Sequence, residues 1–243
     1  MRTNRPMSSA LRAAAPRPDA TASRDEKKNY AQRLSRELAA LIAGSLRSRF
    51  RGILPSAAGE HHESKARSSR GMKKLDVNYS TVELGLGLGV SIKTVTHRDP
   101  RSGRYSKNYT RIDNELRAEA SDYHERQPYA VLVALIFIPR DACTDATARA
   151  ASSFGAAVKA LRPRNHRTAP EQKAERFERL FIGLYEPEGP DAGDCTFFDV
   201  DTAPPRSGSP APGDLLSYEK MISEVEVCYD HRNSPPFRWA DNA

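Results

Sequence analysis

The sequence predicts an α/β domain in which one mixed central sheet lies between flanking helices. Three observations lead to this prediction. Apolar residues recur at steps of three and four from residue 25 to residue 46, a spacing typical of a long amphipathic helix. Residues 129–138 form a continuous apolar run, which is typical of a central strand buried on both faces. Helical and strand patterns also follow one another along the whole chain.

The elements are expected in a definite order. The first helix starts near residue 25, and Gly52 and Pro55 close it. Strands at 74–82 and 86–95 precede a basic loop at 97–109. A second helix begins at Thr110 and ends before Pro128. Beyond the strand at 129–138 the pattern predicts a helix at 146–161, strands at 179–185 and 196–200, a proline-rich loop at 203–213 and a last helix at 215–232.

The domain organisation follows from composition. Residues 1–24 are rich in Ala, Arg, Pro and Ser and contain no apolar block, so we expect a disordered basic arm and no secretory signal. Residues 25–243 are expected to form a single domain. No apolar run is long enough for a membrane span, and the three widely spaced cysteines indicate neither a disulfide framework nor a zinc site. A cytoplasmic protein is therefore expected.

Positive charge is concentrated in two blocks. Residues 1–74 hold 17 Lys and Arg against 6 Asp and Glu, while the whole chain has a net charge of +7. A second block brings together Arg98, Arg101, Arg104, Lys107 and Arg111. Such blocks favour a polyanion partner, most often nucleic acid. The alternative is a solvated basic surface with no specific partner.

An acid and a lysine lie on the two neighbouring strands at 74–82 and 86–95. A hairpin that turns near residues 84–85 would place Asp76 opposite Lys93, with Ser91 and Lys93 on one face because side chains alternate. Val90, Ile92 and the leucines at 84, 86 and 88 would then face the core. The glycines at 85, 87 and 89 are expected to leave the functional face bare for a ligand or another backbone.

Asp76 and Lys93 suit metal-assisted attack on a phosphate. The aspartate would help to hold Mg²⁺, and the lysine would orient a metal-bound water. The alternative is a simple cross-strand ion pair. A second carboxylate is needed, and we expect Glu115 from the following helix, with Glu119 one turn later on the same face. Glu83 is the second choice, because seven extended residues separate it from Asp76 by roughly 23 Å.

Asp76, followed by Ser91-Ile92-Lys93, a helix and a buried strand, resembles the PD-(D/E)XK nuclease superfamily, which includes most type II restriction endonucleases. Residues 26–139 would form this restriction-endonuclease-like core, with residues 140–243 as an extension. The chain departs from the family pattern because Leu75 replaces the proline and Ser91 replaces an acid. Some restriction enzymes have this Ser-x-Lys variant and take the missing glutamate from the next helix, the place of Glu115.

The resemblance implies a Mg²⁺-dependent endonuclease that cleaves double-stranded DNA, of restriction or phage-defence type, with Mn²⁺ as an alternative metal. Asp76, Ser91, Lys93 and Glu115 would form its catalytic site, and the basic block at 98–111 would contact the DNA backbone. A homodimer formed through the extension is left open. One alternative is a non-catalytic DNA-binding protein on the same fold, and another is a protein unrelated to nucleic acid.

Overall fold

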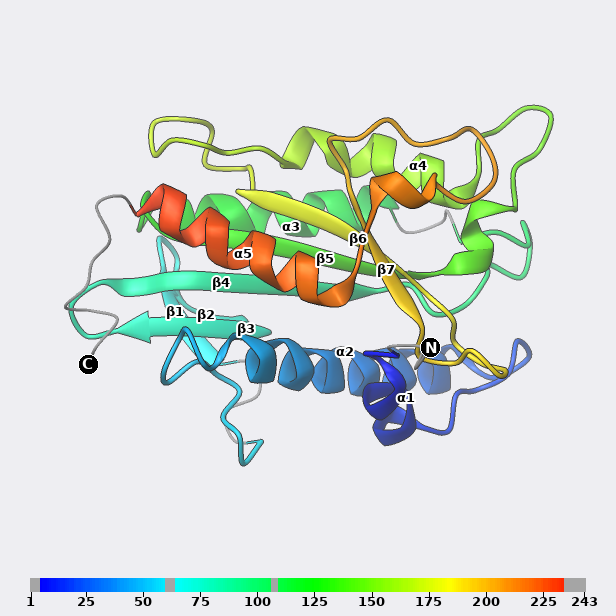
Figure 1. The fold of residues 1–243 in the computed structure, drawn as a ribbon, viewed down its shortest axis with the longest axis horizontal. Coiled ribbons are helices and arrows are strands. Elements are labelled where there is room, and N and C mark those ends of the chain that lie inside the picture. The colour runs from blue at the N-terminus through cyan, green and yellow to red at the C-terminus, as the bar shows by residue number, and fades with distance from the viewer. Residues whose placement is uncertain (1–4, 60–63, 106–108, 234–243) are drawn as a thin grey trace.

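A six-stranded sheet runs through the centre of the structure, a computed structural model that describes residues 5–59, 64–105 and 109–233 (Figure 1). Its order is β3-β4-β5-β6-β7-β8. The central strands β4, β5 and β6 are parallel, whereas β3 at one side and β7 and β8 at the other are antiparallel to their neighbours. The prediction of an α/β fold with a mixed sheet between helices is confirmed. The bounds of these strands are Val77–Thr81, Gly85–Thr94, Val131–Pro139, Arg179–Tyr185, Cys195–Asp199 and Leu215–Leu216.

Helices α2 (Arg24–Leu46) and α5 (Tyr218–Arg232) cover one face of the sheet (Figure 1). Helix α2 begins at a capping box, in which Ser23 and Glu26 each bind the backbone N–H of the other. Its apolar stripe includes Leu34, Leu38 and Ile42, which are buried in one cluster with the inward side chains of β4 and β5. The predicted long first helix is therefore present, and it packs directly beside the strand that carries Lys93.

The other face is covered by α3 (Tyr109–His124), α4 (Ser153–Leu161) and a separate hairpin of β1 (Ser64–Ser68) and β2 (Gly71–Leu75). Every residue of β5 is buried, because this strand lies between both helical layers. The predicted strand at 129–138 and the predicted second helix are confirmed. The helix expected at 146–161 is shorter than predicted, since α4 begins only at Ser153.

The first residues of the described chain do not form a free arm. Helix α1 (Ser8–Ala14) packs against α2, and Met7, Ala10 and Ala14 are buried in the main core. The Met7 N–H also donates to the carbonyl of Gly193. The expectation of a disordered arm is wrong for residues 5–24, because Met7, Ala10, Leu11 and Ala14 have the three- and four-residue spacing of one helix face.

The β3–β4 hairpin differs from the predicted register. Val77 pairs with Val90 and not with Ile92, so the partner strand is shifted by two residues from the predicted register, and Asp76 lies just outside the ladder instead of opposite Lys93. A bulge follows, since Tyr79 pairs with Leu88 but Ser80 pairs with Leu86. The extra residue reverses the face of Leu86, which joins the α3-side core, whereas Leu88, Val90 and Ile92 face α2.

The glycines of β4 are required by packing within the protein. A Cβ at Gly89 would lie 2.9 Å from Leu132 and 3.0 Å from Leu75, and one at Gly87 would meet the ring of Tyr79 at 3.2 Å. The expected bare face for a ligand is therefore wrong at these positions, because neighbouring side chains fill it. Among the described residues, no helix combines the length and apolar character needed to cross a bilayer.

Candidate active site

Asp76 occupies the break between β2 and β3, where it faces the end of β4. Its Oδ2 accepts a hydrogen bond from the Ile92 N–H over 2.6 Å. Because the β3–β4 ladder ends at the pair Val77–Val90, this carboxylate takes over the role of a strand partner for the next outward N–H of β4. Asp76 follows Leu75, the last residue of β2, and precedes Val77, the first residue of β3, so its place between the two strands brings its carboxylate here.

Ser91 and Lys93 share the face of β4 that is turned to α3. Ser91 Oγ donates to Glu119 Oε2 over 3.1 Å, and Lys93 Nζ lies 3.4 Å from the same oxygen. The side chains of Lys93 and Glu119 are largely buried, at 23% and 18% exposure. β4 and α3 therefore form a compact serine–lysine–glutamate cluster. Asp76 lies beside it, because its carboxylate binds the backbone of Ile92, the residue between Ser91 and Lys93.

Glu115 reaches Lys93, as the sequence predicted, but Glu119 lies closer to it. The carboxylate of Glu115 is 3.9 Å from Lys93 Nζ, is 44% exposed and also pairs with Arg111 on its own helix. Glu119 is one turn deeper along α3 and touches both Ser91 and Lys93. The i,i+4 spacing puts both acids on the same helix face, and the packing angle of α3 on the sheet decides which of them lies closer to β4.

Glu83 lies far along the hairpin from this cluster. It is exposed in the turn between β3 and β4, so the whole of β3 separates it from Asp76. The second-choice prediction of Glu83 as a metal ligand is therefore wrong, because the extended strand between Glu83 and Asp76 keeps the two carboxylates apart.

The charge of Lys93 is stabilised by its surroundings. Burial acts to lower the pKa of the ammonium group, but the negative charges of Glu119, Asp76 and Glu115 and the hydrogen bond to Glu119 outweigh it, so the pKa is raised. Lys93 is consequently protonated at neutral pH. It can donate hydrogen bonds and balance negative charge, but it cannot act there as a general base.

A groove of about 1640 Å³ opens at this site. Asp76, Lys93 and Glu115 line it together with the N-terminal half of α2, the end of β4, the loop that follows β4 and the start of α3. Cations outnumber acids along its walls: Arg24, Lys27, Lys28, Arg33, Arg36, Lys93, Arg98, Arg104 and Arg111 against Asp25, Asp76, Asp99 and Glu115. The groove therefore carries the charge expected of a polyanion-binding surface.

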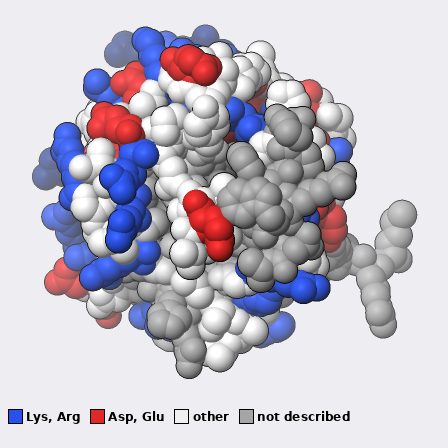
Figure 2. All heavy atoms as spheres, turned by 90° about the vertical axis from the view of Figure 1, so that its left-hand side faces the viewer, with Lys and Arg blue, Asp and Glu red and all other residues white. Residues whose placement is uncertain are grey.

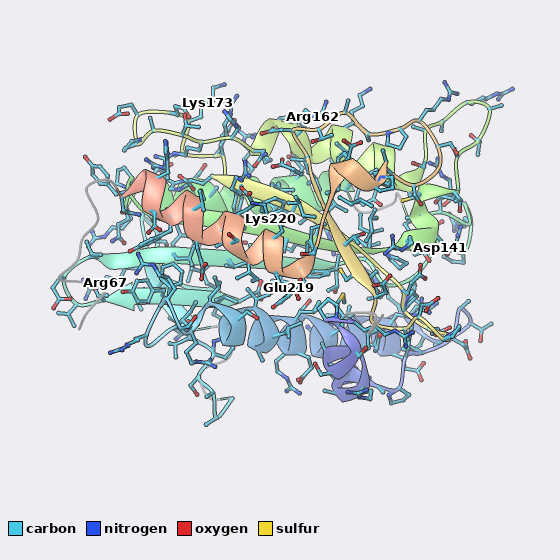
Figure 3. The ribbon with its side chains drawn as sticks, viewed as in Figure 1. Arg67, Asp141, Arg162, Lys173, Glu219 and Lys220 are labelled. Atoms are coloured by element: carbon cyan, nitrogen blue, oxygen red, sulfur yellow. The ribbon has the colours of Figure 1, made fainter. Side chains whose placement is uncertain are left out.

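The loop at 97–105 is exposed at 100–103 but is anchored to the rest of the protein by its side chains. Arg98 pairs with Asp141 at 2.8 Å, Tyr105 donates to the same carboxylate, and Arg104 approaches Asp145 at 3.9 Å (Figure 3 labels Asp141). Of the predicted DNA-contacting residues, Arg98, Arg104 and Arg111 are thus already paired within the chain. Arg101 is exposed at the loop tip. Lys107 lies outside the described residues.

Basic side chains also gather away from the groove. Figure 2 shows a stripe of Lys and Arg along one border of the face at the left-hand side of Figure 1, beside separate acidic patches. The end of β4 that carries Lys93 lies at the other end of the molecule, because the β3–β4 turn is at that left-hand side (Figure 1). Charge alone therefore does not locate a site, and the buried cluster at Lys93 is the more specific feature.

The capacity of the site for a metal is modest. The described residues contain no group of three or more His, Cys, Asp or Glu placed to hold a metal ion. Asp76 and Glu119 nonetheless offer two carboxylates that both lie close to Lys93, and both contacts of Glu119 with Ser91 and Lys93 use a single oxygen, Oε2. Mg²⁺ typically keeps several waters and takes one or two protein carboxylates, so this donor set fits that ion at its lower limit.

No family model, no curated protein and no solved structure matches the chain.

Proposed function

We propose that the chain is a metal-dependent nuclease that hydrolyses phosphodiester bonds in double-stranded DNA, with Asp76, Lys93 and Glu119 as its catalytic centre. The contact of Ser91 and Lys93 with Glu119 carries the proposal, because it supplies a carboxylate to the strand position where the sequence has serine. The setting expected from the resemblance is restriction or phage defence.

The arrangement of elements gives further support. Helix α2, the antiparallel pair β3–β4, helix α3 and the parallel strand β5 follow one another in the order expected of a restriction-endonuclease-like core. Asp76 stands at the start of one antiparallel strand, and Lys93 lies near the end of the other. Glu119, like the predicted Glu115, comes from the helix between β4 and β5.

Asp76 and Glu119 would hold Mg²⁺ or Mn²⁺. A bound ion of this kind supplies Lewis acidity and lowers the pKa of an attached water. The protonated Lys93 then has two tasks that its geometry permits: it donates a hydrogen bond to the attacking oxygen or to a phosphate oxygen, and it balances the charge that develops there. Ser91 is a positioning residue, since its hydroxyl fixes the Glu119 carboxylate from the side.

The groove would receive the DNA backbone. Its wall along α2 presents exposed cations such as Lys28, and the end of β4 that carries Lys93 lines the same groove. Phosphate contacts of this kind orient a duplex without reading its sequence. The small number of carboxylates also favours a second candidate, a DNA-binding protein without catalytic activity on the same fold.

Cleavage of supercoiled plasmid tests the proposal. Wild-type protein should nick plasmid in Mg²⁺ or Mn²⁺ and should stop when EDTA is added. Lys93→Ala should abolish nicking but retain DNA binding, while Lys220→Ala, which removes a lysine from α5 on another part of the surface, should cleave normally (Figure 3). Binding without cleavage would favour the second candidate, and no salt-sensitive DNA affinity would overturn both.

A further inference from the structure

A second cleft, of about 990 Å³, lies beside α4 and has no part in the proposed cleavage. It is bounded by α4, by the 3-10 turn η3 (Arg162–Arg164) and by the segment at 201–206 that follows β7. Figure 3 shows Arg162 at this side of the molecule. Part of its wall is apolar and is formed by Pro163, Pro204 and Pro205.

Four cations line this cleft, and no described carboxylate pairs with any of them. Lys159, Arg162, Arg176 and Arg206 all line the cleft, and none forms an ion pair with any residue that the structure describes. The acid in the lining, Asp201, instead pairs with His166 at 3.1 Å. Uncompensated cations that converge on one cleft favour an anionic ligand.

Two of these cations are also held in place. Arg162 donates to the carbonyls of Val200 and Thr202, and Arg206 donates to the carbonyl of Ala148. Backbone carbonyls fix the guanidinium groups without cancelling their charge. The cleft is therefore prepared for a phosphate group at little cost in side-chain ordering.

Asn165 adds a neutral recognition element. Its side chain is 2% exposed, and Nδ2 donates to Asp199 Oδ1 at 3.4 Å. Because a carboxylate only accepts, the amide nitrogen must face Asp199, which leaves Oδ1 as a buried acceptor with no hydrogen-bond partner among the described residues. A buried acceptor of this kind calls for a donor, and a ligand hydroxyl or amino group would supply one.

We propose that the α4 cleft binds a nucleoside phosphate. Its phosphate groups would lie against Lys159, Arg162, Arg176 and Arg206, a hydroxyl or amino group would donate to Asn165 Oδ1, and the base would pack on the proline wall. The same chemistry is offered by a free nucleotide and by the phosphorylated end of a nucleic-acid strand. This proposal does not depend on the proposed nuclease activity.

Calorimetric titration with ADP, with pyrophosphate and with a 5′-phosphorylated dinucleotide tests the proposal on the full chain. The variant Lys159→Ala/Arg176→Ala removes two cations that line the cleft and whose side chains form no ion pair with any described residue. Lys65→Ala/Arg67→Ala is the matched control, because it removes one lysine and one arginine that are exposed on β1 (Figure 3 labels Arg67). Thermal melting should show that both variants remain folded.

We expect ADP or the dinucleotide to bind wild type and the control, and to bind the cleft variant at least about tenfold more weakly. The tighter of the two identifies the source of the ligand, and either should bind more tightly than pyrophosphate, which has no donor for Asn165. Plasmid nicking should be the same in all three proteins. Absence of binding to wild type, or equal weakening in the control, would overturn the proposal.

Discussion

Ser91 on β4 donates a hydrogen bond to Glu119 on α3 across 3.1 Å. The residue that makes the sequence depart from an acid-x-lysine pattern is therefore the residue that holds an acid in the same place. Lys93 contacts the same oxygen of Glu119. The serine, the lysine and the glutamate act as one unit, and each of the first predictions below depends on that unit.

Loss of the Glu119 charge should lower the pKa of Lys93, so that more of its amine is deprotonated and reactive. In wild type the carboxylates outweigh burial and raise the pKa of Lys93, whereas in Glu119→Gln burial retains its lowering effect and the principal opposing charge is gone. Competitive amine labelling near pH 10, followed by mass spectrometry, should show Lys93 reacting slowly in wild type and faster in the variant. Equal reactivity would contradict the ion pair.

The same interaction gives a stability difference with a definite sign. Because the pKa of Lys93 is raised on folding, its contribution is fully present below the unfolded value of about 10.4 and is lost as the pH rises through the folded pKa. Chemical denaturation of wild type and Glu119→Gln should therefore differ at pH 8, and the difference should shrink at strongly alkaline pH.

Cations of the groove should contribute to DNA affinity through counterion release. Lys28 is exposed on α2 and lines the groove. In Lys28→Ala we expect weaker binding to all duplex sequences and a slope of log K against log salt that is smaller by about 1. Lys220→Ala on α5 serves as the control and should leave the slope unchanged. Fluorescence anisotropy over a range of salt concentrations measures both, and equal slopes in all proteins would place the DNA elsewhere.

Glu178 holds a buried charge network together at the far end of the sheet. It contacts Arg167 at 2.8 Å, His124 at 3.3 Å and Arg232 at 3.4 Å, and it accepts from the Leu132 N–H. Glu178→Gln leaves the guanidinium of Arg167 buried without its counter-charge, so we expect a loss of about 3 kcal/mol in the free energy of unfolding. The exposed Glu171→Gln should change it by less than about 0.5 kcal/mol.

This network also predicts acid sensitivity. Burial acts to raise the pKa of Glu178, but the hydrogen bonds and positive charge around it outweigh burial and lower the pKa. Its contribution is therefore present above the unfolded value of about 4.3 and is lost as the pH falls through the lower folded pKa. Urea titrations at several pH values should show the difference between wild type and Glu178→Gln narrowing in strong acid. A constant difference would contradict this assignment.

The glycine of β4 nearest to the site should tolerate no side chain. A Cβ at Gly89 would push against Leu132 and against Leu75, the residue that precedes Asp76. We expect Gly89→Ala to cost about 1 to 3 kcal/mol of stability and to disturb cleavage as well. Gly213→Ala is the matched control, because a Cβ there meets nothing within 4 Å. A fully stable Gly89→Ala would show that the strand has room to adjust.

Local sequence patterns predicted the elements that bury a continuous apolar face. Helix α2, helix α3 and the fully buried strand β5 follow from spacing and run length alone. Helix α1 has the same spacing over one short stretch, but the Ala-, Arg-, Pro- and Ser-rich composition around it led to the prediction of disorder. The bulge in β4 and the position of the turn could not be predicted in this way, because the strand pairing that defines them does not follow from the spacing of residues along the chain.

The candidate site was predictable in part. Asp76, Ser91 and Lys93 lie at the same end of the β3–β4 pair, as expected. The predicted register, which put Asp76 directly opposite Lys93, was wrong by two residues. The choice between Glu115 and Glu119 depends on the angle of α3 against the sheet, which long-range packing sets. The anchoring of Arg98 by Asp141 likewise joins residues that are distant in the chain.

The central claim is that Glu119, held by Ser91, supplies the missing catalytic carboxylate. Plasmid nicking in Mg²⁺ by Glu119→Gln and Glu115→Gln, two isosteric changes one helical turn apart, tests it most directly. We predict that Glu119→Gln slows nicking by about 100-fold or more and that Glu115→Gln slows it by less than about tenfold. Robust nicking by Glu119→Gln, with or without loss in Glu115→Gln, would contradict the claim.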